Sequence, residues 1–442
     1  MESDIRNSLL RIINEKRDEY VKFLQELVRI PSVMVTDGER TAQEFISKKM
    51  QSVGCSVDMW ETDWNELKNA KSKTTGQSLY VPVETWMTNY KGLKDRPNVV
   101  GVHRGKGDGR SLLLNGHVDV VPPGAVAKWK HGPWSGDIED GLLYGRGAVD
   151  MKAGLAAMIL AVDCVRSAGL RLKGDVILES VVDEETGGNG TLACMLRGYK
   201  ADAGVFTEPT EMEIAVADSG AQFFRISVPG KMVHIGYKNE GVNAIEKAAK
   251  IIAALNDWES DRTTEGHRKY PEYRRYATPF PLVCGAISAG AEMVIPECPA
   301  ELCVVEGAYQ SMPDEAIADV NKDIENFISK TASTDPWMSE HPPKVEFIGL
   351  TYEGARVEST HPIVNALSHA FAETLNASPT ISAFPTGCDM RLYTNHGGTP
   401  SVIFGPGSGR KAHFIDEYVP VDQYIDAIKV LAFLIPNWCG YE

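Results

Sequence analysis

Apolar residues recur at helical spacing at several points along the chain. From Tyr20 to Ile30 they line one side of a helix that packs against a core, and the Ile-Pro-Ser-Val segment beginning at Ile30 ends that helix. Residues 60–94 are weakly patterned and contain Trp and Lys, which predicts an inserted surface excursion. We expect further helices over residues 42–53, 151–168, 242–258, 314–330, 362–375 and 421–434.

Short apolar runs predict buried strands between the first helices. SLLLN at 111–115, DVILESVV at 175–182 and AGVFT at 203–207 are runs of this kind. Strands that alternate with long helices indicate a three-layer α/β/α sheet. Residues that follow the carboxyl end of a buried strand lie at a crevice where α/β folds bind ligands. His117 lies just past one such end.

The pattern changes after Ser219. Strand-like segments at 222–228, 301–309 and 344–350 alternate with two of the predicted helices, as in a small α+β domain. The apolar segment beginning at Ser401 is a strand that returns the chain to the first sheet. A chain of 442 residues also favours two domains. We therefore predict an α/β protein with a catalytic domain of residues 1–218 and 353–442 and an inserted α+β lid and dimerisation domain of residues 219–352.

Composition narrows the choice of partners. The net charge is -15 and the pI is about 5.2, so the chain offers no basic field for nucleic acid or anionic lipid. The opening segment is charged throughout, and no apolar run approaches the length of a membrane span, about 18 residues. The 8 cysteines form no CxxC pair. We expect a cytoplasmic protein with no nucleic-acid or membrane partner.

Six residues could build a metal centre. Each of them alone has an ordinary explanation: a histidine buried in the core, an aspartate that caps a helix, or a glutamate at the surface. Most of them follow predicted strands or Gly-rich turns, where α/β folds place their ligand crevice. Their joint occurrence predicts a hydrolase centre with an unligated base beside the metals. The six are His117 in NGHVD, Asp150 in GRGAVDMK, Glu184 and Glu185 in DEETGG, Glu208 in TEP and His413 in KAHF.

The chain resembles the M20 metallopeptidase and amidohydrolase family over nearly its whole length. That family includes acetylornithine deacetylase, succinyl-diaminopimelate desuccinylase, carboxypeptidase G and aminoacylase. The resemblance implies a zinc-peptidase-like catalytic domain and hydrolysis of an amide bond in a small molecule. It is carried by LLLNGHVDVVPPG, WxxGPWSGDIEDGLLYGRGAVDMKAG, DEETGG, TEPT, VPGKMVH, PTGCDMR, and FGPG followed by AHFIDE.

The resemblance also implies two divalent ions per chain and their ligands. His117 and Glu208 would hold one ion, Glu185 and His413 would hold the other, and Asp150 would bridge the two. Relatives have a cis peptide bond after the bridging aspartate, which here joins Asp150 to Met151. Oxygen and nitrogen ligands suit zinc, our first expectation, with cobalt or manganese as alternatives.

Three further residues receive catalytic roles from the resemblance. Glu184 would take a proton from the water that bridges the ions and pass it to the leaving amine. The carboxylate of Asp119 would accept the proton of the His117 imidazole and so fix its tautomer. His234, on the lid domain, would stabilise the oxyanion from across a homodimer.

The chain departs from the family where relatives hold a substrate carboxylate. They use an Asn just before a VIP segment and an Arg on the next lid strand, whereas Met293 precedes VIP here and residues 301–313 contain no Arg. This difference weakens the expectation of an ordinary N-acyl-amino-acid substrate. Arg391 and Arg225 are candidate substitutes.

The leading functional hypothesis is hydrolysis of a small N-acylated metabolite by a deacetylase-like enzyme. A deformylase or related hydrolase of an aromatic or heterocyclic amine is the second hypothesis, which the missing Asn and Arg favour. A dipeptidase is third. The non-enzymatic alternative is a binding or scaffold protein that has lost the chemistry, but every position of the metal and base motifs is filled.

Overall fold

The computed structural model describes residues 3–72, 78–87, 90, 92–290 and 298–442. The chain divides into two compact units. The larger comprises Met1–Ala217, Arg356–Phe384 and Cys388–Glu442, and the smaller comprises Asp218–Ala355 with Pro385–Gly387. The sequence placed these boundaries at 218/219 and 352/353, and the catalytic and lid roles of the units stay predictions. No helix in the described part of the chain is long and apolar enough to cross a membrane.

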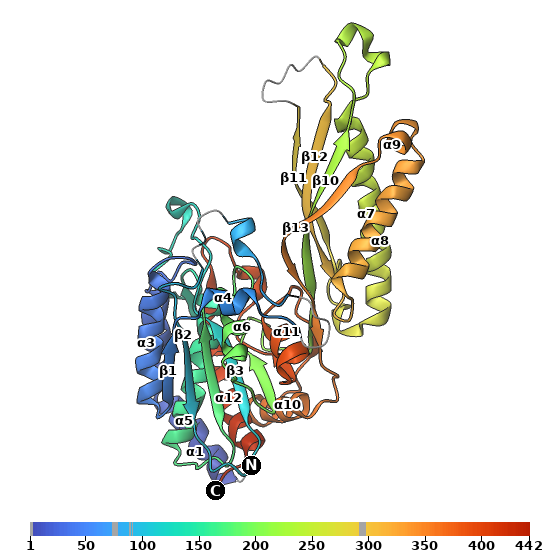
Figure 1. Ribbon diagram of the computed structural model, residues 1–442. Coiled ribbons are helices and arrows are strands. Elements are labelled where there is room, and N and C mark those ends of the chain that lie inside the picture. The colour runs from blue at the N-terminus through green and yellow to red at the C-terminus, as the bar shows by residue number, and fades with distance from the viewer. Residues whose placement is uncertain (1–2, 73–77, 88–89, 91, 291–297) are drawn as a thin grey trace. The chain divides into compact units, whose positions relative to one another are not determined.

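The larger unit is built on a sheet that has eight strands within the described residues. Strands β6, β3, β7 and β16 run parallel to one another at its centre. Strands β2 and β1, which Figure 1 labels, extend one edge in antiparallel pairing. In sheet order the strands are β1 Ser56–Trp60, β2 Asn98–His103, β6 Val176–Val181, β3 Leu112–His117, β7 Ala203–Phe206, β16 Ser401–Ile403, β8 Ile214–Ala215 and β15 Ile381–Ser382.

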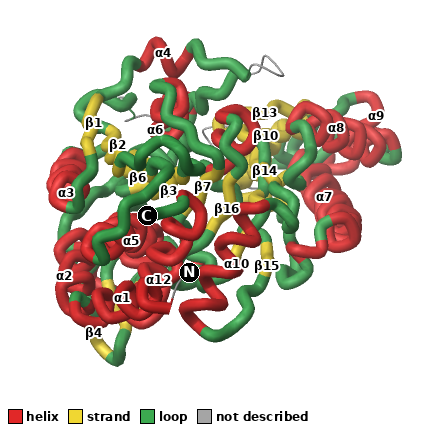
Figure 2. The backbone as a smooth tube through the Cα atoms, turned by 90° about the horizontal axis from the view of Figure 1, so that it is seen from below, coloured by secondary structure: helices red, strands yellow, loops and turns green. Residues whose placement is uncertain are grey.

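Helices cover both faces of this sheet, as Figure 2 shows end-on. One face carries α5 and α12, which pack against each other and against β3, while α6 lies on the other face against β6 and β2. This is the three-layer arrangement that the alternating pattern predicted, and the α/β fold class is confirmed. The helices of this unit are α1 Ser3–Glu15, α2 Arg17–Val28, α3 Gly38–Ser52, α4 Trp64–Lys68, α5 Ala153–Ser167, α6 Asn189–Leu196, α10 Pro362–Leu375, α11 Met390–Leu392 and α12 Val421–Cys439.

Helix α5 is buried on all sides. Every residue from Ala153 to Val165 is inaccessible to solvent or nearly so. Alanine, leucine and other apolar residues fill all of its faces, which is typical of a helix enclosed within a core. Asp150 lies in the turn Ala148–Lys152 that leads into this helix, so the turn is anchored to the most enclosed element of the unit.

A small sheet accompanies the turn. Strand β5 (Leu142–Tyr144) pairs with β17 (Tyr418–Pro420) on one side and with β4 (Ile138–Glu139) on the other. This pairing brings the YGRGAVD segment beside the segment that follows His413.

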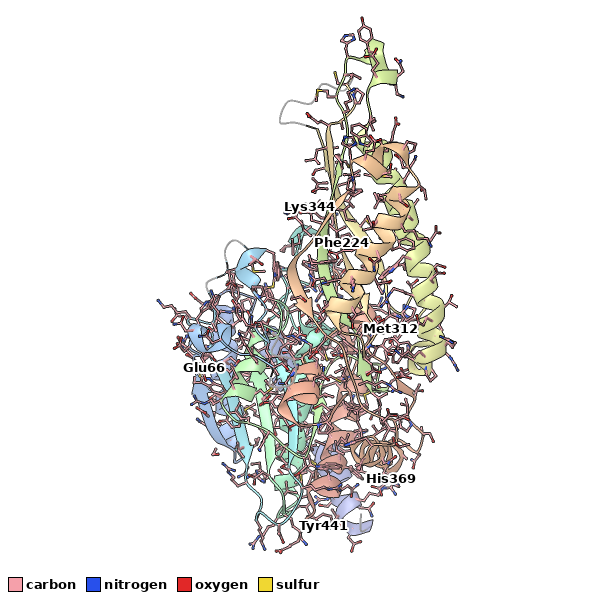
Figure 3. All side chains as sticks on the ribbon, turned by 45° about the vertical axis from the view of Figure 1, so that its right-hand side comes forward. Glu66, Phe224, Met312, Lys344, His369 and Tyr441 are labelled. Atoms are coloured by element: carbon pink, nitrogen blue, oxygen red, sulfur yellow. The ribbon has the colours of Figure 1, made fainter. Side chains whose placement is uncertain are left out.

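The smaller unit is an antiparallel sheet covered by two helices on one face. Its strands in order are β11 Leu282–Ala289, β12 Leu302–Ser311, β10 Gly220–Pro229 and β13 Lys344–Tyr352. Helices α7 (Ala244–Lys269) and α8 (Ile317–Ser333) pack on them over a core that includes Phe224, labelled in Figure 3. Helix α9 (Pro336–Glu340) follows α8, and β9 (Ala217–Asp218) pairs with β14 (Ala355–Arg356) where the chain passes between the units.

The structure differs from the sequence expectations in several places. The segment predicted as a surface excursion is partly packed into the core, because Leu67, Tyr80 and Tyr90 are buried. Helix α7 continues to Lys269 instead of ending near residue 258, because its polar last turns still bury Arg262 and Gly266. Helix α1 and the strands β2 and β11 were not predicted. The charges of the opening segment concealed Leu9, Ile12 and Ile13, which are buried on one side of α1.

Candidate metal centre

The parallel strands bring most of the candidate ligands to one edge of the sheet. His117 is the last residue of β3, and Glu208 follows the end of β7. Glu184 and Glu185 follow β6, the other neighbour of β3. Since the carboxyl ends of neighbouring parallel strands share an edge, these side chains converge there. The turn before α5 adds Asp150, and the loop before β17 adds His413.

Asp150 lies between the two imidazoles. Its Oδ1 is 3.1 Å from His117 Nε2, and its Oδ2 is 3.4 Å from His413 Nε2. The peptide bond from Asp150 to Met151 is cis, as the resemblance implied. One carboxylate therefore presents one oxygen to each histidine, which is the arrangement that a bridging ligand requires.

Each histidine has its own carboxylate neighbours. His413 Nε2 is 3.0 Å from Glu185 Oε2, whereas His117 Nε2 is 3.8 Å from Glu208 Oε1 and 3.9 Å from Glu184 Oε2. Ligand atoms of two trios lie within 4.8 Å of one another: His117, Glu184 and Glu208, and His117, Asp150 and Glu185. The six predicted residues thus form one cluster.

The two sides of the cluster differ in exposure. His117 is 1% exposed and Glu208 is 6% exposed at its side chain, whereas the His413 side chain is 52% exposed. His413 also has a left-handed backbone, with φ of 64°. One side is therefore built from strand ends inside the protein, and the other depends on a surface loop.

Asp119 lies beside the His117 imidazole, with both its main chain and its carboxylate near Nδ1. The backbone carbonyl of Asp119 accepts a hydrogen bond from His117 Nδ1 at 2.8 Å, and the carboxylate Oδ1 lies 3.7 Å from that nitrogen. The carboxylate accepts a bond from the Glu185 amide at 3.3 Å instead. Burial raises the pKa of Asp119 to about 8. The role of Asp119 in fixing the His117 tautomer stays a prediction.

Electrostatics favour a cation in this cluster. Burial raises the pKa of Glu184 and of Glu208 well above the ordinary value, and the charges of neighbouring carboxylates raise both further. Hydrogen bonds with Asp150 and Glu185 raise the pKa of His413 to about 10. Buried carboxylates that repel one another are stabilised by a bound divalent ion. The oxygen and nitrogen donors present fit such ions.

A buried network that the sequence did not reveal holds the DEETGG loop. Asp183, which precedes the two glutamates, has a left-handed backbone and pairs with Arg96 Nη1 at 2.9 Å. Arg96 also pairs with the buried Glu39, and the Tyr90 hydroxyl donates to Asp183 at 2.8 Å. The signal in the sequence was the first acid of DEETGG, but its partners lie far away along the chain.

The candidate substrate residues have partners within their own units. Arg391 is buried and donates to the carbonyls of Gly187 and Cys388, and it lies 3.2 Å from Asp389. Arg225 pairs with Glu306 across β10 and β12. A role in substrate binding stays a prediction for both arginines.

His234 belongs to the smaller unit. It is exposed, and its Nδ1 accepts a hydrogen bond from the Gly236 amide at 3.1 Å. The segment with Met293 and the following VIP lies outside the described residues. The catalytic role of His234 stays a prediction.

Together, the sheet and the carboxylate-imidazole cluster at its edge define a metallohydrolase centre. Comparison with known proteins agrees with this. Residues 113–437 match Peptidase family M20/M25/M40, so the chain belongs to that family. It is a metal-binding hydrolase of amide bonds, and the predicted reaction class is confirmed.

Two deformylases are similar to this chain over nearly its whole length. N-formyl-4-amino-5-aminomethyl-2-methylpyrimidine deformylase of Bacillus subtilis (strain 168) is 30% identical over 98% of this chain and 97% of its own. The enzyme of that name from Halalkalibacterium halodurans is 27% identical over the same shares. The crystal structure of a Staphylococcus aureus tripeptidase, 22% identical, has a TM-score of 0.70 and covers 95% of this chain and 98% of that one.

Proposed function

We propose that this protein is a dinuclear deformylase that acts on an N-formylated, amino-substituted pyrimidine. Water would cleave the formyl C–N bond and release formate and the primary amine. One observation carries the choice of substrate: the similarity to the Bacillus subtilis deformylase extends over 98% of this chain, the smaller unit included. This promotes the second hypothesis from the sequence above the deacetylase-like one.

Five residues would hold the two ions. His117 and Glu208 form the buried side. The largely buried Glu185 and the half-exposed His413 form the other side, called the exposed side because of His413, and Asp150 lies between the two sides. The distances from the Asp150 oxygens to both imidazoles, 3.1 and 3.4 Å, support the bridging role. When bound, two divalent cations supply polarisation of the amide carbonyl and acidify the attacking water. Zinc is the proposed metal, with cobalt or manganese as alternatives.

Glu184 is the proposed general base. Its carboxylate lies 3.9 Å from His117 Nε2, beside the ligands, and its side chain is 17% exposed. Burial and the neighbouring carboxylates raise its pKa, which makes it a stronger proton acceptor. It would take a proton from water and deliver it to the leaving amine. Asp119 would keep His117 in the tautomer that leaves Nε2 free for a metal, since Nδ1 donates to its carbonyl.

The departures from the family pattern support a substrate without a carboxylate. A formylated aminopyrimidine has no carboxylate for the missing Asn and Arg to bind. Arg391 is held by backbone carbonyls, and Arg225 pairs with Glu306, so neither needs a substrate anion as a partner. The two arginines remain the candidates if an acyl-amino acid proves to be the substrate.

The smaller unit would supply an oxyanion donor and a dimer contact. His234 is the proposed donor, acting in the partner subunit of a homodimer. The sheet-edge strand β11 supports a protein contact, because it exposes Val283 and Ile287 at 57% and 56%. A cytoplasmic location is part of the proposal, and the 8 cysteines are all free thiols.

A substrate panel tests the proposal. Purified protein saturated with zinc, cobalt or manganese would be assayed with N-formyl-4-amino-5-aminomethyl-2-methylpyrimidine, its N-acetyl analogue, N-acetylornithine, N-succinyl-diaminopimelate and Ala-Ala. We expect the first compound to be hydrolysed to formate and the amine. Its kcat/KM should be at least about a hundredfold above the kcat/KM for hydrolysis of each other compound. Turnover confined to acyl-amino acids or dipeptides would overturn the choice of substrate. No turnover with any metal would overturn the enzyme itself.

A further inference from the structure

The loops that carry Asp150 and His413 meet at one buried ion pair. Arg146 Nη1 is 2.5 Å from Glu417 Oε2, and the two side chains are 3% and 0% exposed. Arg146 stands four residues before Asp150, and Glu417 stands four residues after His413. The pair therefore lies where the two ligand segments pass each other, beside the pairing of β5 with β17.

Each partner of the pair also binds the main chain of a ligand segment. Glu417 Oε1 accepts hydrogen bonds from the amides of Val149 and Asp150, at 3.0 and 3.2 Å. Arg146 Nη2 donates to the carbonyl of His413 at 3.2 Å. The bridging carboxylate and the exposed imidazole are thus tied to the same two side chains.

This contact matters most for the exposed side of the centre. His117 ends a central strand and Glu208 follows another, so the sheet itself fixes both. His413 lies in a loop with a left-handed backbone and a half-exposed side chain, so few packing contacts hold it. The bond from Arg146 fixes the carbonyl of that residue directly.

Stability alone does not explain a pair of this kind. Burying two charges costs free energy, and their mutual attraction does little more than offset that cost. Two apolar side chains of similar size in the same place would often stabilise the fold equally well. The planar guanidinium has a property that an apolar side chain and a lysine both lack: two donors at a fixed angle. Arg146 uses one for Glu417 and the other for His413, and it lies 5.3 Å from the Trp129 ring centroid.

We propose that the Arg146–Glu417 pair is a positioning device that sets the affinity of the exposed cation site, formed by Glu185, His413 and Asp150. The inference rests on the metal ligands of the proposed function. Breaking the pair releases the His413 loop and weakens that site, while the strand-borne site with His117 and Glu208 keeps its ligands. The ion in the exposed site is then the one that the protein loses first.

Zinc titration of the metal-free protein tests this without an activity assay. Wild type is expected to bind two zinc ions in separable steps, and His413→Ala should remove the weaker step. Arg146→Lys keeps the charge but loses the fork, so it should weaken the same step about tenfold or more and change the tighter step by less than about threefold. Arg197→Lys is the matched control, since Arg197 forms a two-pronged pair with Asp58 on the surface. It should change neither step.

The outcomes separate the two proposals. Equal weakening of both steps in Arg146→Lys, or no weakening of either, overturns the positioning role. If Arg146→Lys does not fold when metal-free, Glu417→Gln is judged by the same two steps, because it keeps an acceptor for both amides but loses the ion pair. A wild type that binds fewer than two ions overturns the proposed ligand set itself, before any variant is compared.

Discussion

The two compact units differ in where they place their reactive and apolar groups. The larger unit buries charged and titratable groups, including His117, Asp119 and Glu208, beneath the edge of its sheet. The smaller unit exposes its one proposed catalytic residue, His234, together with the apolar neighbours Met232, Ile235 and Tyr237. Most candidate functional residues of the larger unit are thus buried, with His413 as the half-exposed exception, whereas the candidate of the smaller unit is exposed to solvent.

This difference indicates how substitutions in each unit should affect function. A buried, mutually hydrogen-bonded cluster loses its function when a single member changes, because each group depends on its neighbours. An exposed residue contributes only when something binds to it, so its loss should leave the rest of its unit intact. Variants in the two units should therefore separate chemistry from recognition and assembly.

The largest effect is expected from Glu184→Gln in the larger unit. Loss of a general base should lower kcat about a thousandfold, and both metal ions should stay bound. Steady-state kinetics and metal analysis on one preparation measure both quantities. Because Glu184 also lies within 4.8 Å of donors on His117 and Glu208, loss of one ion would make it a ligand instead. Glu66→Gln, an exposed change on α4 (Figure 3), is the control and should alter neither quantity.

His234→Ala should have a smaller effect, confined to turnover. Loss of one oxyanion donor costs roughly a hundredfold or more in kcat. Metal content and thermal stability should not change, because the side chain is exposed. Mixing this variant with Glu184→Gln should restore part of the activity if His234 acts in the partner subunit. His341→Ala, at an exposed histidine stacked on Trp337, is the control. Turnover equal to wild type would remove His234 from catalysis.

The smallest effect is expected from Asp335 and concerns only stability. Asp335 caps α9 by accepting bonds from the amides of Trp337 and Met338, and it pairs with Lys247 and Lys250 at 2.8 and 2.6 Å. Asp335→Ala loses both the helix cap and the ion pairs, and it should lower the free energy of unfolding by about 2 kcal/mol. Asp335→Asn keeps an oxygen for the cap and loses only the ion pairs, so it should lower that free energy by about 1 kcal/mol.

The pH dependence of that difference provides a second check. Burial opposes the charge on Asp335, but the bonds from Lys247 and Lys250 hold its pKa below the usual value. A depressed folded-state pKa stabilises the protein above the unfolded value of about 3.9 and loses that contribution as the pH falls through the folded value. The difference in unfolding free energy between wild type and Asp335→Asn should therefore have its full size at pH 7 and decrease below about pH 4. A difference that grows in acid would contradict the assignment.

Local patterns in the sequence predicted the central strands and brought out most of the candidate metal ligands. Apolar runs located β3, β6 and β7, and the residues just past their ends contained most of the ligand set. Partners that lie far apart along the chain could not be predicted in this way. Nothing local to Arg96 indicates that it holds Asp183, and nothing near Arg146 indicates Glu417. Helix α1 was not predicted because the charged residues of its own segment hid the apolar ones. The surface that buries Leu9 and Ile13 comes from helices elsewhere in the chain.

The enclosed position of α5 determines how the metal centre is opened. Backbone amides inside a helix that is buried on every side exchange with solvent only when the whole unit unfolds. Because Asp150 lies in the turn joined to that helix, we expect the carboxylate proposed as the bridge to stay in place through the small fluctuations that open surface loops. Ions would then leave through movements of the His413 loop, and a chelator would strip the protein long before heat unfolds it.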